Sequence, residues 1–180
     1  MRTVVFGILV LVCHQHVAAE VLKSEKDGFL IEIKQATIAE PAECFRIFVE
    51  DFGKWWDPSH SYSRNPASMS LDLKRMAMFE KLPNNGFVRH MEIVFYQPDK
   101  MLRLSGGLGP LQPKGVSGAL TFEFQKTGQG CEVLVSYNVS GSSLQALDKI
   151  AKPVDAVLTR QLKRFAERCV KVASDSDQKK

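Results

Sequence analysis

The fold is decided by one stretch near the C-terminus, PVDAVLTRQLKRFAERCVKV at residues 153–172. Apolar side chains recur in it three or four positions apart, which places them on one side of an α-helix. This stripe consists of Val154, Leu158, Leu162, Phe165, Cys169 and Val172. We predict a long helix that begins at Pro153, because proline is favoured in the first turn of a helix. The stripe needs an apolar partner surface, and the strands upstream supply the only large one.

The chain before this helix is expected to form mainly β-strands. Residues 29–34 alternate apolar and polar side chains, the period-two signal of a half-buried strand. A short helix is predicted from Pro41, and a second one ends at Pro58. Further strands are predicted over 68–74, 76–82, 87–96, 101–105, 118–126 and 129–139. Because the links between them are short, the strands should form an antiparallel sheet.

A sheet of about seven strands is wider than one helix can cover. We therefore expect it to curve around the C-terminal helix in an α+β, helix-grip arrangement, with two short helices after the first strand. Such a fold can leave a hollow between sheet and helix. The apolar positions expected to line it are Phe122, Phe124, Val135, Tyr137, Leu158 and Leu162.

The N-terminus has the pattern of a secretory signal peptide. A short basic end precedes an apolar run over 4–13, and Val17 and Ala19 suit the positions that signal peptidase reads. The run covers only about half of a ~30 Å hydrocarbon core, so it is too short to span a membrane. We predict cleavage after Ala19 and export to the periplasm or the medium. The predicted parts are a signal peptide (1–19), a single domain (20–173) and a polar tail (174–180).

The composition is that of one globular domain of 180 residues, with 44% hydrophobic and 24% charged residues. It excludes a disordered chain, a coiled coil and a multi-span membrane protein. A net charge of +4 is too small for a dedicated nucleic-acid binder, so no nucleic-acid partner is expected. Cleavage would leave Cys44, Cys131 and Cys169, which allow one disulfide at most. Their spacing matches no zinc signature, and their apolar neighbours indicate small buried side chains.

Four stretches resemble a known superfamily: DFGKWWDPSH (51–60), FEKLP (79–83), GFVRHME (86–92) and LSGGLGPLQ (104–112). They are similar to the START-like (SRPBCC) superfamily, closest to its polyketide cyclase/dehydrase and lipid-transport branch, which neighbours the chaperone ATPase-activator group. The resemblance covers nearly the whole chain after the leader. It implies a helix-grip fold whose cavity holds an apolar molecule. One departure is Arg75-Met76-Ala77, where the resemblance would favour a glycine-rich link between strands.

The most informative polar residues lie in a predicted hairpin that turns at Pro83–Gly86. Such a turn would place Glu80 opposite His90, and Met78 opposite Glu92, on one face. An imidazole between two carboxylates on an apolar wall could orient a polar ligand group or act as an acid–base pair. If the opposite face is buried instead, these residues form a solvated ladder without a function. A slip of one residue would also exchange the partners.

Other candidate residues belong to loops and strands around the expected cavity. Trp55 and Trp56 are adjacent on a short helix and cannot both point into the same core, so either one of them lines the mouth of the cavity or both close the end of the sheet. His60 follows in a polar loop that could form its rim, and the glycines around Leu108 indicate a bent loop at the entrance. The predicted ligand-binding residues are Trp55, Trp56, His60, Met78, Glu80, His90, Leu104, Leu108, Phe122, Phe124, Tyr137, Leu158 and Leu162.

Two functions stay open at this point. The favoured one is an exported, non-enzymatic carrier or sensor of a lipid or polyketide-like molecule. The alternative is a cyclase- or dehydratase-type enzyme that uses His90 with Glu80 or Glu92 as acid and base. No catalytic motif supports a firm assignment, and neither a metal nor a cofactor is expected. The basic outer side of the C-terminal helix could touch anionic lipid heads, on charge alone.

Overall fold

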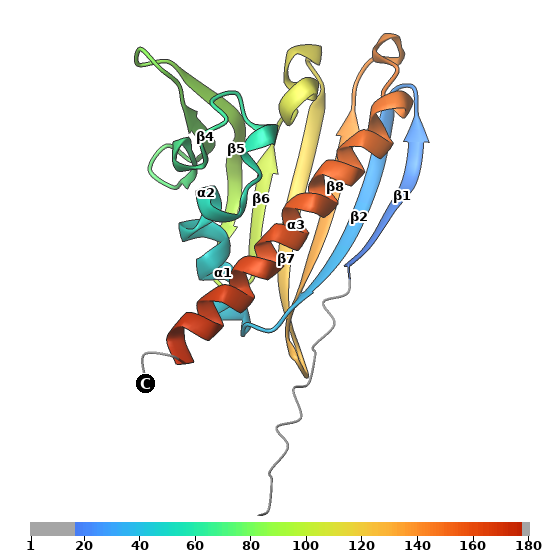
Figure 1. The fold of residues 1–180 in the computed structure, drawn as a ribbon. Helices are drawn as coiled ribbons and strands as arrows, with labels where there is room; N and C mark the ends of the chain where they lie inside the picture. Colours follow the sequence, from blue (N-terminus) through green and yellow to red (C-terminus); the bar gives the residue numbers. More distant parts are fainter. Residues whose placement is uncertain (1–16, 178–180) are drawn as a thin grey trace, which may run out of the picture.

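A computed structural model describes residues 17–177, which form one antiparallel sheet and a long helix that crosses it (Figure 1). Eight strands occur in this part of the chain, in the order β1-β2-β8-β7-β6-β5-β4-β3. They are β1 (Val17–Glu25), β2 (Gly28–Thr37), β3 (Met69–Asp72), β4 (Ala77–Lys81), β5 (Phe87–Gln97), β6 (Met101–Ser105), β7 (Ser117–Thr127) and β8 (Gly130–Ser140). The sheet is open, with β1 and β3 at its edges, and the predicted α+β class is confirmed.

The predicted number of about seven strands was wrong because β1 was missed. This strand pairs with β2 along its length and forms one edge of the sheet. Only Val17 and Val21 in it are partly buried, and its other side chains are exposed. An edge strand of this kind has no apolar alternation, so its sequence gives no period-two signal.

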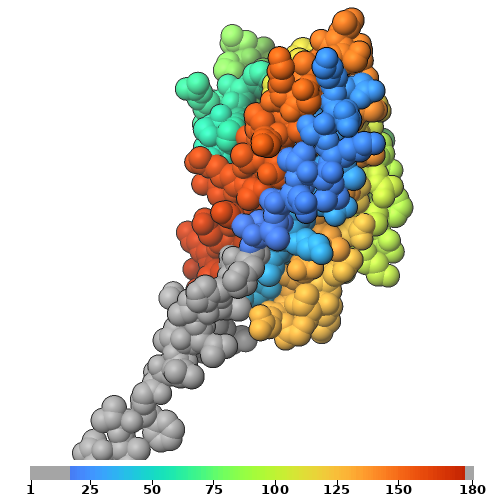
Figure 2. Space-filling view, turned by 90° about the vertical axis from the view of Figure 1, so that its right-hand side faces the viewer, coloured from blue at the N-terminus to red at the C-terminus, as the bar shows by residue number. Residues whose placement is uncertain are grey.

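The long helix α3 (Asp148–Asp177) lies diagonally across one face of the sheet (Figure 1). Its first half contacts β1 and β2, and Figure 2 shows β1 beside α3 on one surface of the molecule. The expected stripe is buried from Val154 through Cys169, while Val172 is partly buried. The long helix and its buried stripe are therefore as predicted.

The predicted start of this helix was wrong. The helix begins at Asp148, and Pro153 lies inside it. The N–H groups of Ile150 and Ala151 bond to the carbonyl of Leu147 at 3.0 and 3.1 Å, so a turn is closed before the proline. Leu147 is fully buried and anchors this turn, which offsets the helical hydrogen bond that a proline cannot donate.

Two short helices, α1 (Pro41–Glu50) and α2 (Phe52–Trp55), fill the space between the sheet and the second half of α3. Their aromatic rings form a packed cluster around Phe48. The ring centroid of Phe48 lies 4.7 Å from that of Phe122 and 4.8 Å from that of Trp55. It lies 5.2 Å from that of Phe165 and 5.4 Å from that of Phe124. This part of the expected hollow is therefore solid core.

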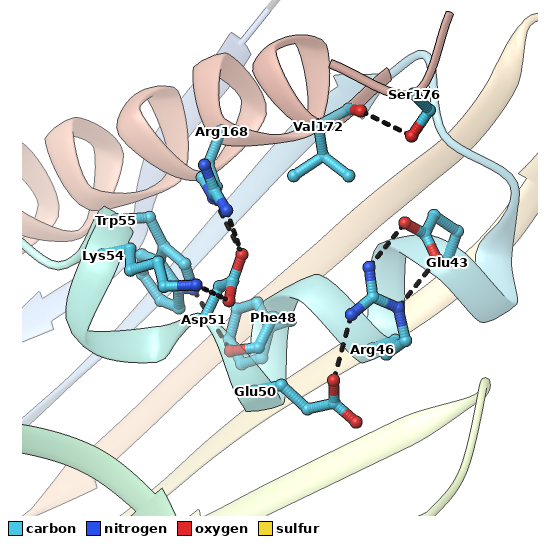
Figure 3. A network of polar contacts seen from close by, with 10 residues as sticks. All are labelled: Glu43, Arg46, Phe48, Glu50, Asp51, Lys54, Trp55, Arg168, Val172 and Ser176. Atoms are coloured by element: carbon cyan, nitrogen blue, oxygen red, sulfur yellow. Dashed lines mark hydrogen bonds and ion pairs between the residues drawn. The ribbon is translucent and has the colours of Figure 1, made fainter. Parts of the chain in front are cut away.

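A largely buried carboxylate ties α2 to α3 (Figure 3). Asp51 accepts hydrogen bonds from Arg168 of α3 at 2.6 and 2.8 Å and from Lys54 at 2.7 Å. Burial disfavours the charge of Asp51, but these two cations outweigh it and lower the pKa of the carboxyl. By contrast, the pairs that Arg46 forms on α1 are exposed and contribute little to stability.

The turn between β3 and β4 contains the departure noted in the sequence. Met76 has a φ of 48°, a left-handed conformation that favours glycine. The strands nevertheless pair from Asp72 with Ala77 to Met69 with Glu80. The non-glycine residue therefore strains the turn without disrupting the strand pairing.

Part of the predicted signal peptide, residues 1–16, lies outside the described residues. The predicted cleavage point after Ala19 falls inside β1, where Ala19 pairs with Ile33. The predicted polar tail begins as helix, because α3 continues to Asp177. None of the helices in the described part of the chain is both long and apolar enough to cross a membrane. The signal peptide and the domain limits stay predictions.

Candidate functional site

A cavity of about 360 Å³ lies between the first turns of α3 and the loops at one end of the sheet. The antiparallel order brings the β6–β7 loop, the β8–α3 loop and the start of α3 to this end. Two 3₁₀ turns, η1 (Pro58–His60) and η3 (Gly109–Lys114), border it. The lining residues are Trp56, Ser59, His60, Ser61, Tyr62, His90, Leu108, Gly109, Pro110, Ile150, Pro153, Val154, Val157 and Leu158.

The walls of the cavity differ in polarity. α3 contributes an apolar wall that includes Val154, Val157 and Leu158, and Leu108 adds to it from the loop before η3. The segment 59–62 contributes serine, histidine and tyrosine side chains on another side, next to His90 of β5. A cavity of this size with few polar groups has the character of a small-molecule site.

His90 is hydrogen-bonded to a carboxylate behind the polar wall. Its Nε2 lies 2.8 Å from Oε2 of Glu80, and the exposed fractions are 5% for His90 and 0% for Glu80. The backbone N–H groups of Tyr62 and Ser63 donate to the same carboxylate. Burial disfavours the charge of Glu80, but the hydrogen bonds from Ser63, His90 and Tyr62 outweigh it and lower the pKa of the carboxyl. Glu80 is therefore ionised at neutral pH.

A β-bulge brings these two side chains together. Glu80 pairs with Val88, and Met78 pairs with Met91, so His90 is the extra residue where the register shifts. The predicted register, with Glu80 opposite His90 and Met78 opposite Glu92, was wrong. A β-bulge changes the direction in which side chains point, and here it turns His90 towards Glu80 and the cavity.

Glu92 does not take part in this site. It is exposed and forms an ion pair with Arg89 at 2.5 Å on the solvent side. The alternative of a solvated ladder therefore describes Glu92, while Glu80 and His90 are buried. One carboxylate, not two, accompanies the imidazole.

The loop that follows α2 is held in place at several points. The indole N–H of Trp56 donates to the carbonyl of His60 at 3.2 Å, and the carboxylate of Asp57 accepts from the N–H of Ser59 at 2.9 Å. Beyond them the ring of Tyr62 stacks on that of His90, with centroids 5.9 Å apart and an angle of 25°. The Glu80–His90 pair therefore fixes this loop as well as facing the cavity.

Tyr137 of β8 holds the second loop. Its hydroxyl donates to the carbonyl of Gly106 at 3.1 Å and accepts from the N–H of Leu108 at 3.0 Å. Burial raises the pKa of the phenol to about 12, so this hydroxyl keeps its proton. Gly106 has a φ of 125°, a conformation that residues other than glycine rarely adopt. Together these contacts present Leu108 to the cavity.

The structure brings some of the predicted ligand-binding residues to the cavity and places others elsewhere. Trp56, His60, His90, Leu108 and Leu158 line it, and Glu80 lies directly behind His90. The other predicted residues are buried in the packed core: Trp55, Met78, Leu104, Phe122, Phe124, Tyr137 and Leu162.

Sequence reasoning missed the part of the cavity formed by the start of α3. Ile150, Val154 and Val157 lie four and three residues apart, which continues the apolar pattern of the helix towards its N-terminus. This signal was present in the sequence. Ile150 was missed because the helix was expected to begin at Pro153. Val154 and Val157 fall inside the predicted helix but were not assigned to the cavity.

The three cysteines of the described residues belong to the packed core. Cys44, Cys131 and Cys169 are free and buried. Contact with Cys131 lowers the pKa of the Cys44 thiol, but contact with Cys169 and burial outweigh this effect. The pKa is therefore raised, to about 12. A buried thiol with a raised pKa, such as that of Cys44, is a poor nucleophile and a poor ligand. In the part of the chain that is described, no three histidine, cysteine or acidic side chains are placed to hold a metal ion.

A curved antiparallel sheet with a long C-terminal helix across it defines the class of helix-grip-like folds, and known structures share it. An uncharacterised protein from Rhizobium leguminosarum is 13% identical with a TM-score of 0.57, over 87% of this chain and 99% of its own. The Mll3558 protein from Rhizobium loti is 15% identical with a TM-score of 0.53, over 85% of this chain and 99% of its own.

A third similar structure is the di-domain aromatase/cyclase StfQ from the steffimycin biosynthetic pathway. It is 11% identical with a TM-score of 0.55, over 83% of this chain and 53% of the di-domain protein. No family model and no curated protein matches the sequence. Identities this low show a shared fold alone.

Proposed function

We propose that this protein binds a hydrophobic small molecule with one polar group in the cavity next to His90, and that it acts as an exported carrier or sensor of that molecule. The observation that carries the proposal is the combination of an apolar wall from α3 with one buried Glu80–His90 pair. Apolar surface provides the affinity and a single fixed polar group orients the ligand, which is the usual design of such sites.

The size of the cavity supports a small ligand. Its volume of about 360 Å³ is near the lower end of the range of about 300–1,000 Å³ usual for small-molecule pockets. Each 100 Å² of apolar surface that a ligand buries there contributes about 2.5 kcal/mol. Because this volume is near the lower limit, a compact ring system fits the site better than a long acyl chain.

We further propose that the chain is a member of the START-like superfamily. The motifs quoted above and the fold shared with StfQ support this proposal. Export is tested separately, by N-terminal sequencing of the protein recovered from its natural host. A mature chain that begins at Glu20 is expected, and an intact N-terminus on cell-associated protein would contradict export.

Native mass spectrometry after incubation with an extract of host lipids and secondary metabolites tests the binding proposal. The wild type should retain a small molecule, whose mass the spectrum gives directly. Val157→Trp places a large ring into the cavity and should abolish retention. Val170→Trp is the matched control on an exposed part of α3 and should retain the molecule. Absence of any retained mass, or equal retention by both variants, would contradict the proposal.

A second function is favoured by one specific observation. A neutral imidazole that donates Nε2–H to an ionised carboxylate can act as a general base through its other nitrogen, and Glu80 and His90 have this geometry. A cyclase- or dehydratase-type enzyme would lose turnover in His90→Ala while keeping its ligand. A ligand-bound wild type that forms no product over hours would favour the carrier.

A further inference from the structure

His90 lines the cavity, and one of its ring nitrogens has no hydrogen-bond partner within residues 17–177. Nε2 is engaged with Glu80, whereas no hydrogen bond of Nδ1 occurs within residues 17–177. Nδ1 is not fully enclosed by protein atoms, and a ligand in the cavity lined by His90 can reach it. Because the carboxylate of Glu80 can only accept, a neutral imidazole must carry its proton on Nε2. Nδ1 then carries a lone pair that can accept a hydrogen bond from a ligand.

The less exposed polar side chains of the wall, Ser61 and Trp56, are already engaged. The hydroxyl of Ser61 donates to the carbonyl of Pro58 at 2.8 Å and accepts from the N–H of Arg64 at 3.1 Å. The indole N–H of Trp56 is bonded to a backbone carbonyl, as described above. Ser59, His60 and Tyr62 also line the cavity but are exposed to solvent. Nδ1 of His90 is therefore the buried group that a ligand would meet.

The charges around the cavity act against an anionic ligand. Glu80 is ionised directly behind His90, and a second carboxylate at Nδ1 would be repelled by it in a poorly solvated site. Neither lysine nor arginine is among the lining residues, so an anion would find no counter-charge. It would also face the lone pair of Nδ1 instead of a proton.

We infer that the polar group of the ligand is an uncharged hydrogen-bond donor, a hydroxyl on an apolar skeleton, and that the site rejects the matching carboxylate. This inference rests on the proposed function of the cavity. It names the chemical class of ligand, since a phenol or alcohol donates its proton to Nδ1 of His90 while its carbon skeleton packs on α3.

Three probes with the same ring system test it: 2-naphthol, naphthalene and 2-naphthoate. Their affinities for the full-length protein are measured by equilibrium dialysis at about pH 8, where an ordinary imidazole is neutral. Naphthol should bind about five- to tenfold tighter than naphthalene, the usual gain from one hydrogen bond. Naphthoate should bind at least about tenfold more weakly than naphthalene, because its charge is desolvated without a partner. Naphthoate binding as tightly as naphthol would overturn the inference.

His90→Phe keeps a ring at this position and removes Nδ1, so naphthol and naphthalene should bind it equally. Tyr96→Phe removes an exposed hydroxyl from the same strand and should keep the preference for naphthol. ¹⁵N spectra of the imidazole in the wild type give a readout that needs no variant. They should show a bare Nδ1 whose resonance shifts on addition of naphthol, and a protonated Nδ1 would refute the inference. If none of the three probes binds, the proposed function fails instead.

Discussion

Replacing Glu80 with glutamine tests whether the buried carboxylate holds the cavity loop. The two carboxylate oxygens together accept from Tyr62, Ser63 and His90. A glutamine has one acceptor oxygen, and its NH₂ group must face one of these donors. One buried N–H is then left without a partner, which costs about 1–3 kcal/mol, and the remaining bonds lose their charge assistance. We expect Glu80→Gln to lower the free energy of unfolding by about 2–4 kcal/mol.

Urea denaturation measures this loss, with Glu92→Gln as the matched control on the solvent side of the neighbouring strand. The exposed pair of Glu92 with Arg89 contributes at most about 1 kcal/mol. Hydrogen exchange of the Tyr62 and Ser63 amides locates the effect, and both should exchange faster in Glu80→Gln. Equal stability of the two variants, with unchanged exchange of these amides, would refute the role given to Glu80.

The same variant gives a pH dependence with a definite sign. The pKa of Glu80 is lower in the folded state, so its ionisation stabilises the fold. This contribution is complete above the ordinary carboxyl pKa of about 4.3 and is lost as the pH falls through the lower folded value. The difference in stability between wild type and Glu80→Gln should therefore be constant near neutral pH and shrink below about pH 4. A difference that grows on acidification would contradict this assignment.

Three further outcomes are expected. Tyr137→Phe should lower the free energy of unfolding by about 1–3 kcal/mol in urea denaturation, because it leaves backbone groups of Gly106 and Leu108 without partners. In the wild type, ultraviolet titration should show this phenol ionising only near its raised pKa of about 12, and ionisation near 10 would contradict its burial. Met76→Gly should raise the melting temperature, because glycine adopts the left-handed conformation of residue 76 without strain. Leu73→Gly in the same turn should lower the melting temperature.

The long helix and the class of the fold could be predicted from the sequence because each rests on a repeated pattern. The stripe from Val154 to Val172 has only one physical interpretation, a helix with a single buried side. β1 could not be found in this way, because an edge strand is solvated on most of its length and shows no alternation. The start of α3 was misplaced because Pro153 is tolerated within the helix once Leu147 anchors the preceding turn.

The candidate site was predictable in its residue types and not in its geometry. Glu80 and His90 stand out as polar residues in apolar strands, and they do form a pair. The prediction that they lie directly opposite each other assumed an uninterrupted strand register. Nothing in the local sequence marks His90 as the extra residue of a bulge. The position of the cavity depends on which aromatic rings fill the core. Long-range packing of Phe48 against Phe122 and Phe165 decides this, and no periodicity encodes it.

The separation between the aromatic cluster and the cavity has a consequence for engineering this scaffold. Rings contributed by α1, α2, β7 and α3 stabilise one part of the molecule, while segment 59–62, η3 and the first turns of α3 surround the hollow in another. Residues such as Pro110 and Val157 can therefore be randomised in a library while the rings around Phe48 are kept constant. Variants that bind new ligands can then be selected with little loss of thermal stability.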